Sequence, residues 1–215
     1  SAASDVYKRQ VYNRWGSVWN QYLAQQGYIV FSMDSRGMSG RGEEFKNLSY
    51  GDMSKYLSKD TAAGVRYLVD IGVADPDRIG AWGWSGGGYF TGLMLTKNAD
   101  LFDVGVSVAP VMDFRLYDTI YTERFMRTPQ ENPVGYDSNS PINYVDKLKG
   151  KYLLIHGSGD DNVHVQNTLR MVEALVQANM KFLWMIYPDK NHGIYGGNTQ
   201  NHLYTKMTNF IIENL

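Results

Sequence analysis

Short apolar runs alternate with amphipathic stretches along the chain. Five runs have the composition of β-strands: residues 28–33, 78–82, 104–108, 152–156 and 182–187. Helical periodicity fills the sequence around them, at residues 17–26, 53–71, 86–97, 165–179 and 200–214. Continuous apolar strands of this kind are typical of a parallel sheet with helices on both faces. The alternation therefore predicts an α/β fold whose sheet is mostly parallel.

Two segments interrupt the alternation. Residues 34–51 and 127–141 are rich in Gly, Asn, Asp and Pro, so we expect surface loops there. In an α/β fold, loops of this length usually cover a functional site, and the alternative is surface loops without a function. No repeat or linker divides the 215 residues, a length suited to one hydrophobic core. The pattern therefore indicates a single domain.

Composition and charge exclude several classes of protein. The chain has 21 basic and 22 acidic residues, so its net charge of -1 gives no reason to expect a nucleic acid partner. It contains no cysteine, which excludes disulfides, a cysteine nucleophile and thiolate metal sites. No uncharged apolar run is long enough to span a membrane. Enzymes and binding domains both remain open.

Residues 83–87 read Gly-Trp-Ser-Gly-Gly and lie between a predicted strand and a predicted helix. G-x-S-x-G in that context is the nucleophile elbow, in which a strained turn lifts the serine hydroxyl above the sheet. Ser85 is therefore the candidate nucleophile, and the backbone N–H of Gly86 is the candidate oxyanion donor. A glycine-rich turn without chemistry is the alternative. A phosphate-binding loop would need a lysine or Walker spacing, and the segment has neither.

A serine nucleophile needs a histidine base and a carboxylate that orients it. His192 lies in the loop between the last predicted strand and the last predicted helix, where the base of an α/β-hydrolase belongs. The other three histidines have ordinary structural interpretations, at a strand end, a helix start and within a helix: His156, His164 and His202. For the acid, Asp160 and Asp161 both follow the strand 152–156, and either could instead cap the next helix. The pattern favours Asp160, which is nearer the strand, without excluding Asp161.

Three segments together resemble the prolyl oligopeptidase family, and within it the dipeptidyl peptidase IV branch: residues 83–89, 117–124 and 154–164. The resemblance covers about residues 11–215. It implies an α/β-hydrolase fold and a serine peptidase with Ser85 as nucleophile, Asp160 as orienting carboxylate and His192 as base. It also implies cleavage after proline or alanine with release of N-terminal dipeptides, and no metal or organic cofactor.

The same resemblance implies a substrate pocket. Tyr117 and Tyr121 match tyrosines that wall a proline pocket, and Asn162 matches an amide that holds the carbonyl before that proline. Four further residues are expected to help line the pocket: Trp84, Val111, Phe114 and Val163. Without the family match, core packing would be the simpler interpretation of the two tyrosines.

The chain departs from the family at two places. Gly86 stands where dipeptidyl peptidase IV has a bulky aromatic residue, which would widen the pocket beyond strict proline selectivity. The family's second oxyanion donor is a tyrosine close to a Gly-Pro pair, which residues 1–10 lack, so the role is not assigned to Tyr7. We interpret residues 1–10 as a segment foreign to the family, such as a cloning or assembly artefact, and residues 11–215 as the hydrolase domain.

The number of predicted strands bears on how much of a domain the chain contains. Five strands are predicted here, whereas the hydrolase fold usually has eight. One of the three strands without a counterpart normally lies inside the sheet, beside the strand that leads to Ser85. We therefore interpret the chain as a C-terminal catalytic fragment that is poorly stable alone. The family also implies an N-terminal β-propeller, a homodimer and a periplasmic or secreted location. The competing functions are a carboxylesterase-like hydrolase with the same triad and an inactive binding module that retains the fold.

Overall fold

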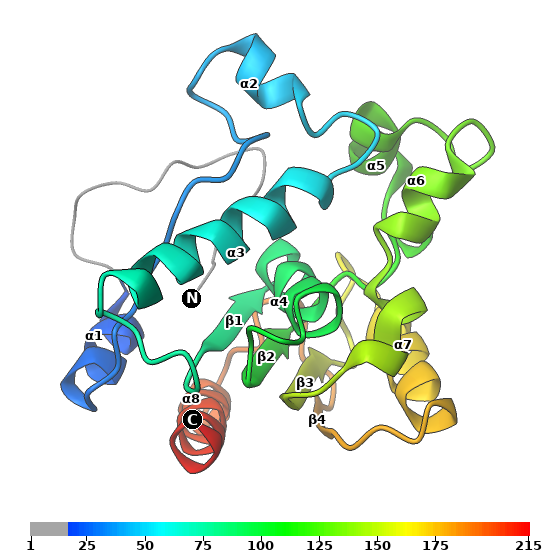
Figure 1. Ribbon diagram of the computed structural model, residues 1–215. Coiled ribbons are helices and arrows are strands. Elements are labelled where there is room, and N and C mark those ends of the chain that lie inside the picture. The colour runs from blue at the N-terminus through cyan, green and yellow to red at the C-terminus, as the bar shows by residue number, and fades with distance from the viewer. Residues whose placement is uncertain (1–16) are drawn as a thin grey trace.

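The computed structural model describes residues 17–215, which contain a four-stranded parallel sheet (Figure 1). The strand order follows the sequence: β1 (Gly80–Trp84), β2 (Val104–Val108), β3 (Lys151–Gly157) and β4 (Leu183–Tyr187). Each neighbouring pair is parallel, as the apolar runs predicted. β1 begins two residues later than the sequence pattern indicates, and the other three strands match their predicted ranges closely.

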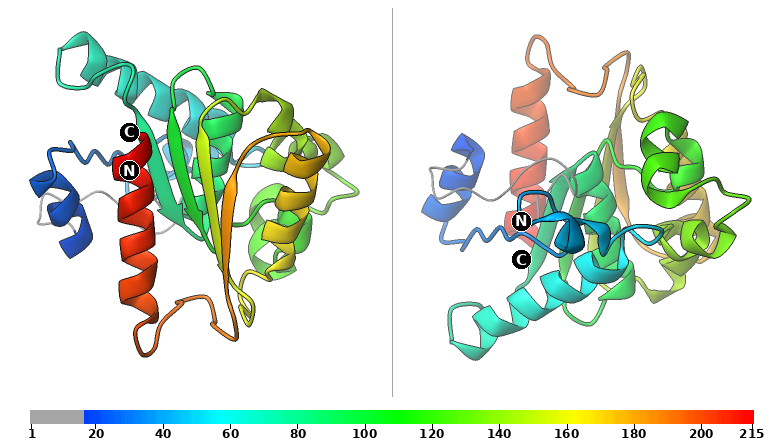
Figure 2. Two further views of the ribbon diagram at one scale, coloured as in Figure 1. Left: turned by 90° about the horizontal axis from the view of Figure 1, so that it is seen from below. Right: turned by 90° about the horizontal axis from the view of Figure 1, so that it is seen from above.

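Helices connect the strands and cover the sheet. The α-helices are α1 (Val18–Gln25), α2 (Glu43–Asn47), α3 (Lys55–Asp70), α4 (Gly86–Lys97), α5 (Thr119–Met126), α6 (Pro133–Ser138), α7 (Gln166–Gln177) and α8 (Thr199–Asn214). Two 3-10 helices are η1 (Phe114–Leu116) and η2 (Pro141–Lys147). Figure 2 shows α1 and α8 on one face of the sheet and α3, α4 and α7 on the other.

The two helix layers enclose two hydrophobic clusters, one on each face of the sheet. Alternate residues of β3 enter opposite clusters, because successive strand side chains point to opposite faces. Tyr152 and Leu154 pack with residues of α3, α4 and α7. Leu153 and Ile155 pack with residues of α1 and α8. The central strands are therefore buried on both sides, which accounts for their continuous apolar sequence.

Short helices form inside both predicted loops. α2 lies within residues 34–51, and α6 lies within residues 127–141. The Asn132 side chain accepts a hydrogen bond from the N–H of Gly135 at 3.1 Å, and Pro133 occupies the first turn of α6. A capping side chain followed by proline is a helix-start signal. The Asn and Pro that indicated a loop in the sequence therefore begin a short helix here.

The predicted strand at residues 28–33 is wrong. No strand pairs with this segment among the described residues, and β1 is the end strand of the sheet they form. A cavity of about 310 Å³ is lined by Tyr28 and Phe31 on one side and by Ala81 and Trp82 of β1 on the other. The segment has the composition of a strand, but it lines the cavity and forms no strand among the described residues.

The cavity lies beside the strand that leads to Ser85, where the family resemblance implies an interior strand. Its lining residues also come from α3 and α8, so it is bounded by both helix layers as well as by β1. Residues 1–16 lie outside the described residues. The structure therefore does not test the interpretation of residues 1–10 as foreign to the family, or whether Tyr7 has a role as an oxyanion donor.

Candidate active site

Ser85 occupies a tight turn between β1 and α4. Its φ of 58° and ψ of -117° are strained for a residue with a side chain. The Ser85 N–H donates to the carbonyl of Val108 at 2.8 Å, and the Ser85 carbonyl accepts the first helical bond from Tyr89 at 3.0 Å. The structure therefore confirms the strand–turn–helix context that gives the G-x-S-x-G motif its meaning.

Close packing explains two of the glycines around Ser85. A Cβ at Gly83 would lie 2.2 Å from backbone atoms of Gly87, and one at Gly88 would lie 2.9 Å from Pro110. Only glycine lets the end of β1 and the start of α4 approach so closely. Gly86 differs, because a Cβ there would meet nothing within 4 Å. The space that a bulkier residue would occupy beside Ser85 is open.

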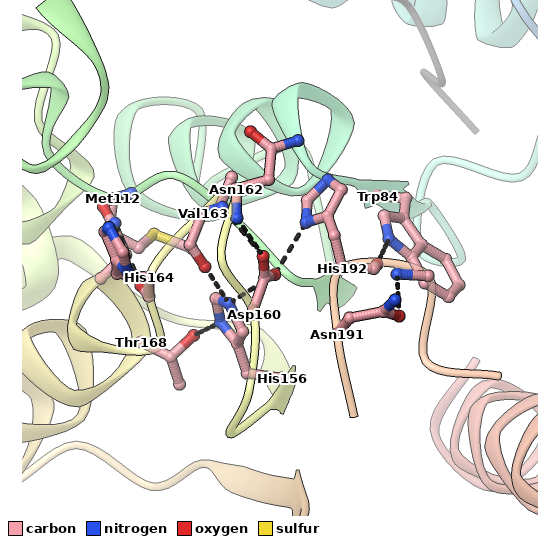
Figure 3. Close-up of polar contacts among 12 residues, drawn as sticks. Trp84, Met112, His156, Asp160, Asn162, Val163, His164, Thr168, Asn191 and His192 are labelled. Carbon is pink, nitrogen blue, oxygen red and sulfur yellow. Dashed lines mark hydrogen bonds and ion pairs between the residues drawn. The ribbon is translucent and has the colours of Figure 1, made fainter. Parts of the chain in front are cut away.

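Asp160 and His192 are joined across two loops at the carboxyl edge of the sheet (Figure 3). Oδ2 of Asp160 lies 2.7 Å from Nδ1 of His192. Oδ1 of Asp160 accepts the backbone N–H groups of Asn162 at 3.0 Å and Val163 at 2.9 Å. Asp161 is exposed, and no side chain caps α7. The structure thus brings Asp160, and not Asp161, against the candidate base.

The Asp160 carboxyl is charged despite its burial. Burial opposes ionisation, but hydrogen bonds from His156 and His192 outweigh it and hold the pKa of Asp160 well below its usual range. An ionised carboxylate accepts the Nδ1–H of His192, which leaves Nε2 of that ring to accept a proton from a nucleophile. The Asp160 side chain is inaccessible to solvent, whereas that of His192 is 24% exposed.

Trp84 connects the elbow to the loop of the candidate base. Its indole Nε1–H donates to the backbone carbonyl of His192 at 2.9 Å. Within residues 17–215, no hydrogen bond joins the Ser85 hydroxyl to His192. The structure therefore holds nucleophile and base on adjoining segments without the direct contact, which in many enzymes forms only when substrate binds.

The N–H of Gly86 is well suited to stabilise an oxyanion. Gly86 is the first residue of α4, and the first N–H groups of a helix have no partner within the helix. The positive end of the α4 dipole lies at the same place. Tyr7, to which the family's second oxyanion role is not assigned, lies outside the described residues.

Tyr117 and Tyr121 form an aromatic corner near Asn162. Their ring centroids are 5.4 Å apart and the rings are nearly perpendicular, at 85°. Both side chains are half-buried against the core, so core packing accounts for part of their contacts. The Tyr117 hydroxyl donates to Oδ1 of the exposed Asn162 at 3.0 Å. The structure thus brings together the three residues expected to recognise substrate most directly.

Three of the four other expected pocket residues are buried, whereas Trp84 is half-buried. Val111, Phe114 and Val163 are 4%, 5% and 0% exposed, so they support the tyrosines from the core. Phe114 also packs edge-on against Tyr89 of α4, with ring centroids 4.8 Å apart. Among the described residues, no three His, Asp or Glu side chains are grouped so that they could hold a metal ion.

No helix in the part of the chain that the structure describes is long and apolar enough to cross a membrane.

One residue at the site makes more contacts than its position in the sequence suggested. His156, expected to be a packing histidine at the end of a strand, contacts the carboxylate of Asp160. The only sequence signal was its position four residues before Asp160.

Comparisons with known proteins show the family of the chain. The family model described as "Prolyl oligopeptidase family" matches residues 15–215. Prolyl endopeptidase FAP of Mus musculus is 41% identical over 197 residues, which cover 90% of this chain and 26% of that protein. Probable dipeptidyl-aminopeptidase B of Neurospora crassa is 40% identical over 190 residues, which cover 87% and 21%. The chain spans about a quarter of the length of these curated relatives.

Solved structures extend the comparison. The crystal structure of Porphyromonas gingivalis dipeptidyl peptidase 4 superposes with a TM-score of 0.94 at 46% identity, covering 100% of this chain and 30% of that chain. A putative dipeptidyl aminopeptidase IV from Bacteroides ovatus superposes with a TM-score of 0.88 at 38% identity, covering 92% and 28%.

Proposed function

The chain belongs to the prolyl oligopeptidase family of serine peptidases and has the α/β-hydrolase fold, and from this premise we propose that it releases N-terminal dipeptides by cleaving after proline or alanine. The observation that carries the proposal is the 2.7 Å hydrogen bond between Asp160 and His192, in a site whose serine occupies a strained elbow. Structural neighbours described as dipeptidyl peptidases support the choice of dipeptides.

The proposed reaction proceeds through an acyl-enzyme. Nε2 of His192 takes the proton of the Ser85 hydroxyl as its oxygen attacks the scissile carbonyl, and Asp160 holds the ring by its Nδ1–H. The N–H of Gly86 stabilises the negative oxygen of the tetrahedral intermediate. His192 then gives its proton to the leaving amine. Water, deprotonated by His192, releases the dipeptide and restores Ser85.

Substrate recognition would rest on the aromatic corner. The flat faces of Tyr117 and Tyr121 suit the rigid pyrrolidine ring of proline. Because Oδ1 of Asn162 accepts from Tyr117, its Nδ2 is left to donate to the substrate carbonyl that precedes that proline. The open space at Gly86 favours acceptance of alanine as well as proline.

The experiment compares substrates and labels the nucleophile in the full-length protein. We expect a fluorophosphonate probe to modify Ser85, and a dipeptidyl anilide with proline at the cleavage site to be hydrolysed faster than a short-chain ester. Preference for the ester would favour the carboxylesterase-like alternative. Failure to label Ser85 in folded protein would refute serine hydrolysis and leave the inactive binding module.

The full-length protein is proposed to carry an N-terminal β-propeller that grips the amino terminus of the substrate, and to form a homodimer. The support for additional sequence is that the chain covers only 26% of prolyl endopeptidase FAP. The periplasmic or secreted location is a proposal that rests on the family alone.

A further inference from the structure

A second histidine contacts Asp160 from a different side than His192 does (Figure 3). His156 is the penultimate residue of β3 and is 0% exposed. Its Nε2 lies 2.8 Å from the carbonyl oxygen of Val163 and 3.2 Å from Oδ2 of Asp160. Its Nδ1 lies 2.7 Å from the hydroxyl of Thr168 on α7. Both ring nitrogens therefore have partners, and neither partner is water.

The hydrogen-bond partners of His156 determine which of its ring nitrogens carries a hydrogen. The carbonyl of Val163 and the carboxylate of Asp160 can only accept hydrogen bonds, so Nε2 of His156 carries a hydrogen whether the ring is neutral or charged. Thr168 fixes the rotation of the ring from its other side. His156 is thus a rigid donor aimed at the carboxylate.

The oxygen that receives this donor is the one that holds the base. Oδ2 of Asp160 lies 2.7 Å from Nδ1 of His192 and 3.2 Å from Nε2 of His156, so two imidazole rings share it. Oδ1 is held separately by backbone N–H groups. With donors on both oxygens, the carboxylate cannot rotate about its bond to the chain without losing hydrogen bonds that burial makes costly to lose.

We propose that His156 is a positioning residue that orients Asp160 toward His192 and, by sharing Oδ2, limits how strongly that carboxylate favours the protonated base. The inference rests on the proposed triad of Ser85, His192 and Asp160. A merely structural histidine would fill space and bond to Thr168. The proposed role requires in addition that loss of the Nε2–H alters the proton affinity of the base.

The test compares His156→Phe with His156→Gln in the full-length protein. Phe fills the space without a donor, whereas the Gln side chain can place an N–H near the position of Nε2. For Phe we expect roughly a tenfold fall in kcat with KM unchanged, the effect of losing one charge-assisted hydrogen bond. We also expect the acid limb of the pH profile to move to higher pH, because a carboxylate with one donor fewer stabilises the protonated base more strongly. Gln should restore both quantities most of the way to wild type.

A matched control separates this role from folding. His202 also makes a 2.7 Å hydrogen bond between its Nδ1 and a hydroxyl, that of Tyr187, but no bond to Asp160. We expect His202→Phe to leave the pH profile unchanged. If His156→Phe does not fold, Thr168→Val is the second variant, since it frees the ring while keeping the donor, and it should shift the profile in the same direction by less.

An unchanged pH profile in the folded His156→Phe variant would overturn the inference, as would an unchanged profile in Thr168→Val should His156→Phe not fold. The test separates failure of this inference from failure of the proposed triad on which it rests. If the triad is wrong, the fluorophosphonate probe does not modify Ser85 in the wild-type protein. If only the inference is wrong, the probe modifies Ser85 and the pH profile of the folded variant is unchanged.

Discussion

The contact between Gly83 and Gly87 gives a sharp prediction about the elbow. A Cβ placed on Gly83 lies 2.2 Å from the carbonyl carbon and oxygen of Gly87. Carbon atoms in ordinary contact are roughly 3.5 Å apart, so Gly83→Ala would have to separate the end of β1 from the start of α4 by about 1.3 Å. Ser85 lies between the two residues, so the hydroxyl would move with them.

A displacement of about 1 Å at a reacting group typically costs on the order of 100-fold in rate. We expect Gly83→Ala to lower the rate of fluorophosphonate labelling of Ser85 by that amount. The matched control is Gly86→Ala in the same turn, where the added Cβ meets nothing within 4 Å and the labelling rate should stay near wild type. Both variants are measured in the full-length protein, by mass spectrometry of the Ser85 peptide against time.

Circular dichroism of each variant distinguishes a displaced serine from an unfolded domain, and the labelling rates are compared for folded protein only. If Gly83→Ala folds and is labelled as fast as Gly86→Ala, the reasoning that close packing of β1 and α4 sets the position of Ser85 is refuted.

Further predictions concern the pocket, the base, acid stability and the isolated chain. Gly86→Tyr should raise the ratio of kcat/KM for proline over alanine substrates by roughly 10-fold, the value of one or two methylene contacts, and an unchanged ratio would show that the open space does not adjoin the pocket. Trp84→Phe, which removes the 2.9 Å bond to the His192 carbonyl, should slow labelling by about 10-fold with little change in urea midpoint, and a loss of stability without slower labelling would contradict it. The pKa of Asp160 is lowered in the folded state, so ionised Asp160 stabilises the fold fully at pH values above the ordinary carboxyl pKa, near 4. This stabilisation is lost as the pH falls further, through the lowered pKa. In the Asp160→Asn variant, the free energy of unfolding measured in urea should therefore fall less steeply with decreasing pH. The 215-residue chain alone should unfold at low temperature and without a sharp transition, because the edge of β1 has no partner strand among the described residues, and a cooperative, high-temperature transition in calorimetry would disprove this.

Most of this fold is predictable from the sequence, because its strands and its nucleophile elbow are marked by residues that are adjacent in the chain. The strands β2 and β3 are continuous apolar runs, and the elbow is a motif of adjacent residues whose neighbouring strand and helix are visible in the pattern. Asp160 and Asp161 could not be separated from spacing alone. The choice depends on which carboxylate reaches a loop 32 residues away, and that is a property of the folded sheet edge.

The wrong strand and the unforeseen contact of His156 with Asp160 have a common origin. Residues 28–33 have strand composition, but a strand exists only where another strand pairs with it, and the described residues supply none. His156 is a buried histidine with partners at both ring nitrogens near the end of β3, as expected, but its contact with Asp160 depends on how the ring is oriented between Thr168 and Asp160. Pairing and ring orientation are long-range facts, so neither can be read from the neighbours in sequence.

The cavity beside β1 has a consequence for handling the protein. Its lining includes Val30, Phe31 and Trp82, and beside it the outer edge of β1 has no partner strand within residues 17–215. An apolar cavity next to a strand edge that has no partner strand among the described residues can accept an extended segment, including one from another copy. Concentrated solutions of the 215-residue chain should therefore form aggregates that bind amyloid-type dyes, and expression together with a strand that fills the cavity should keep the chain dispersed.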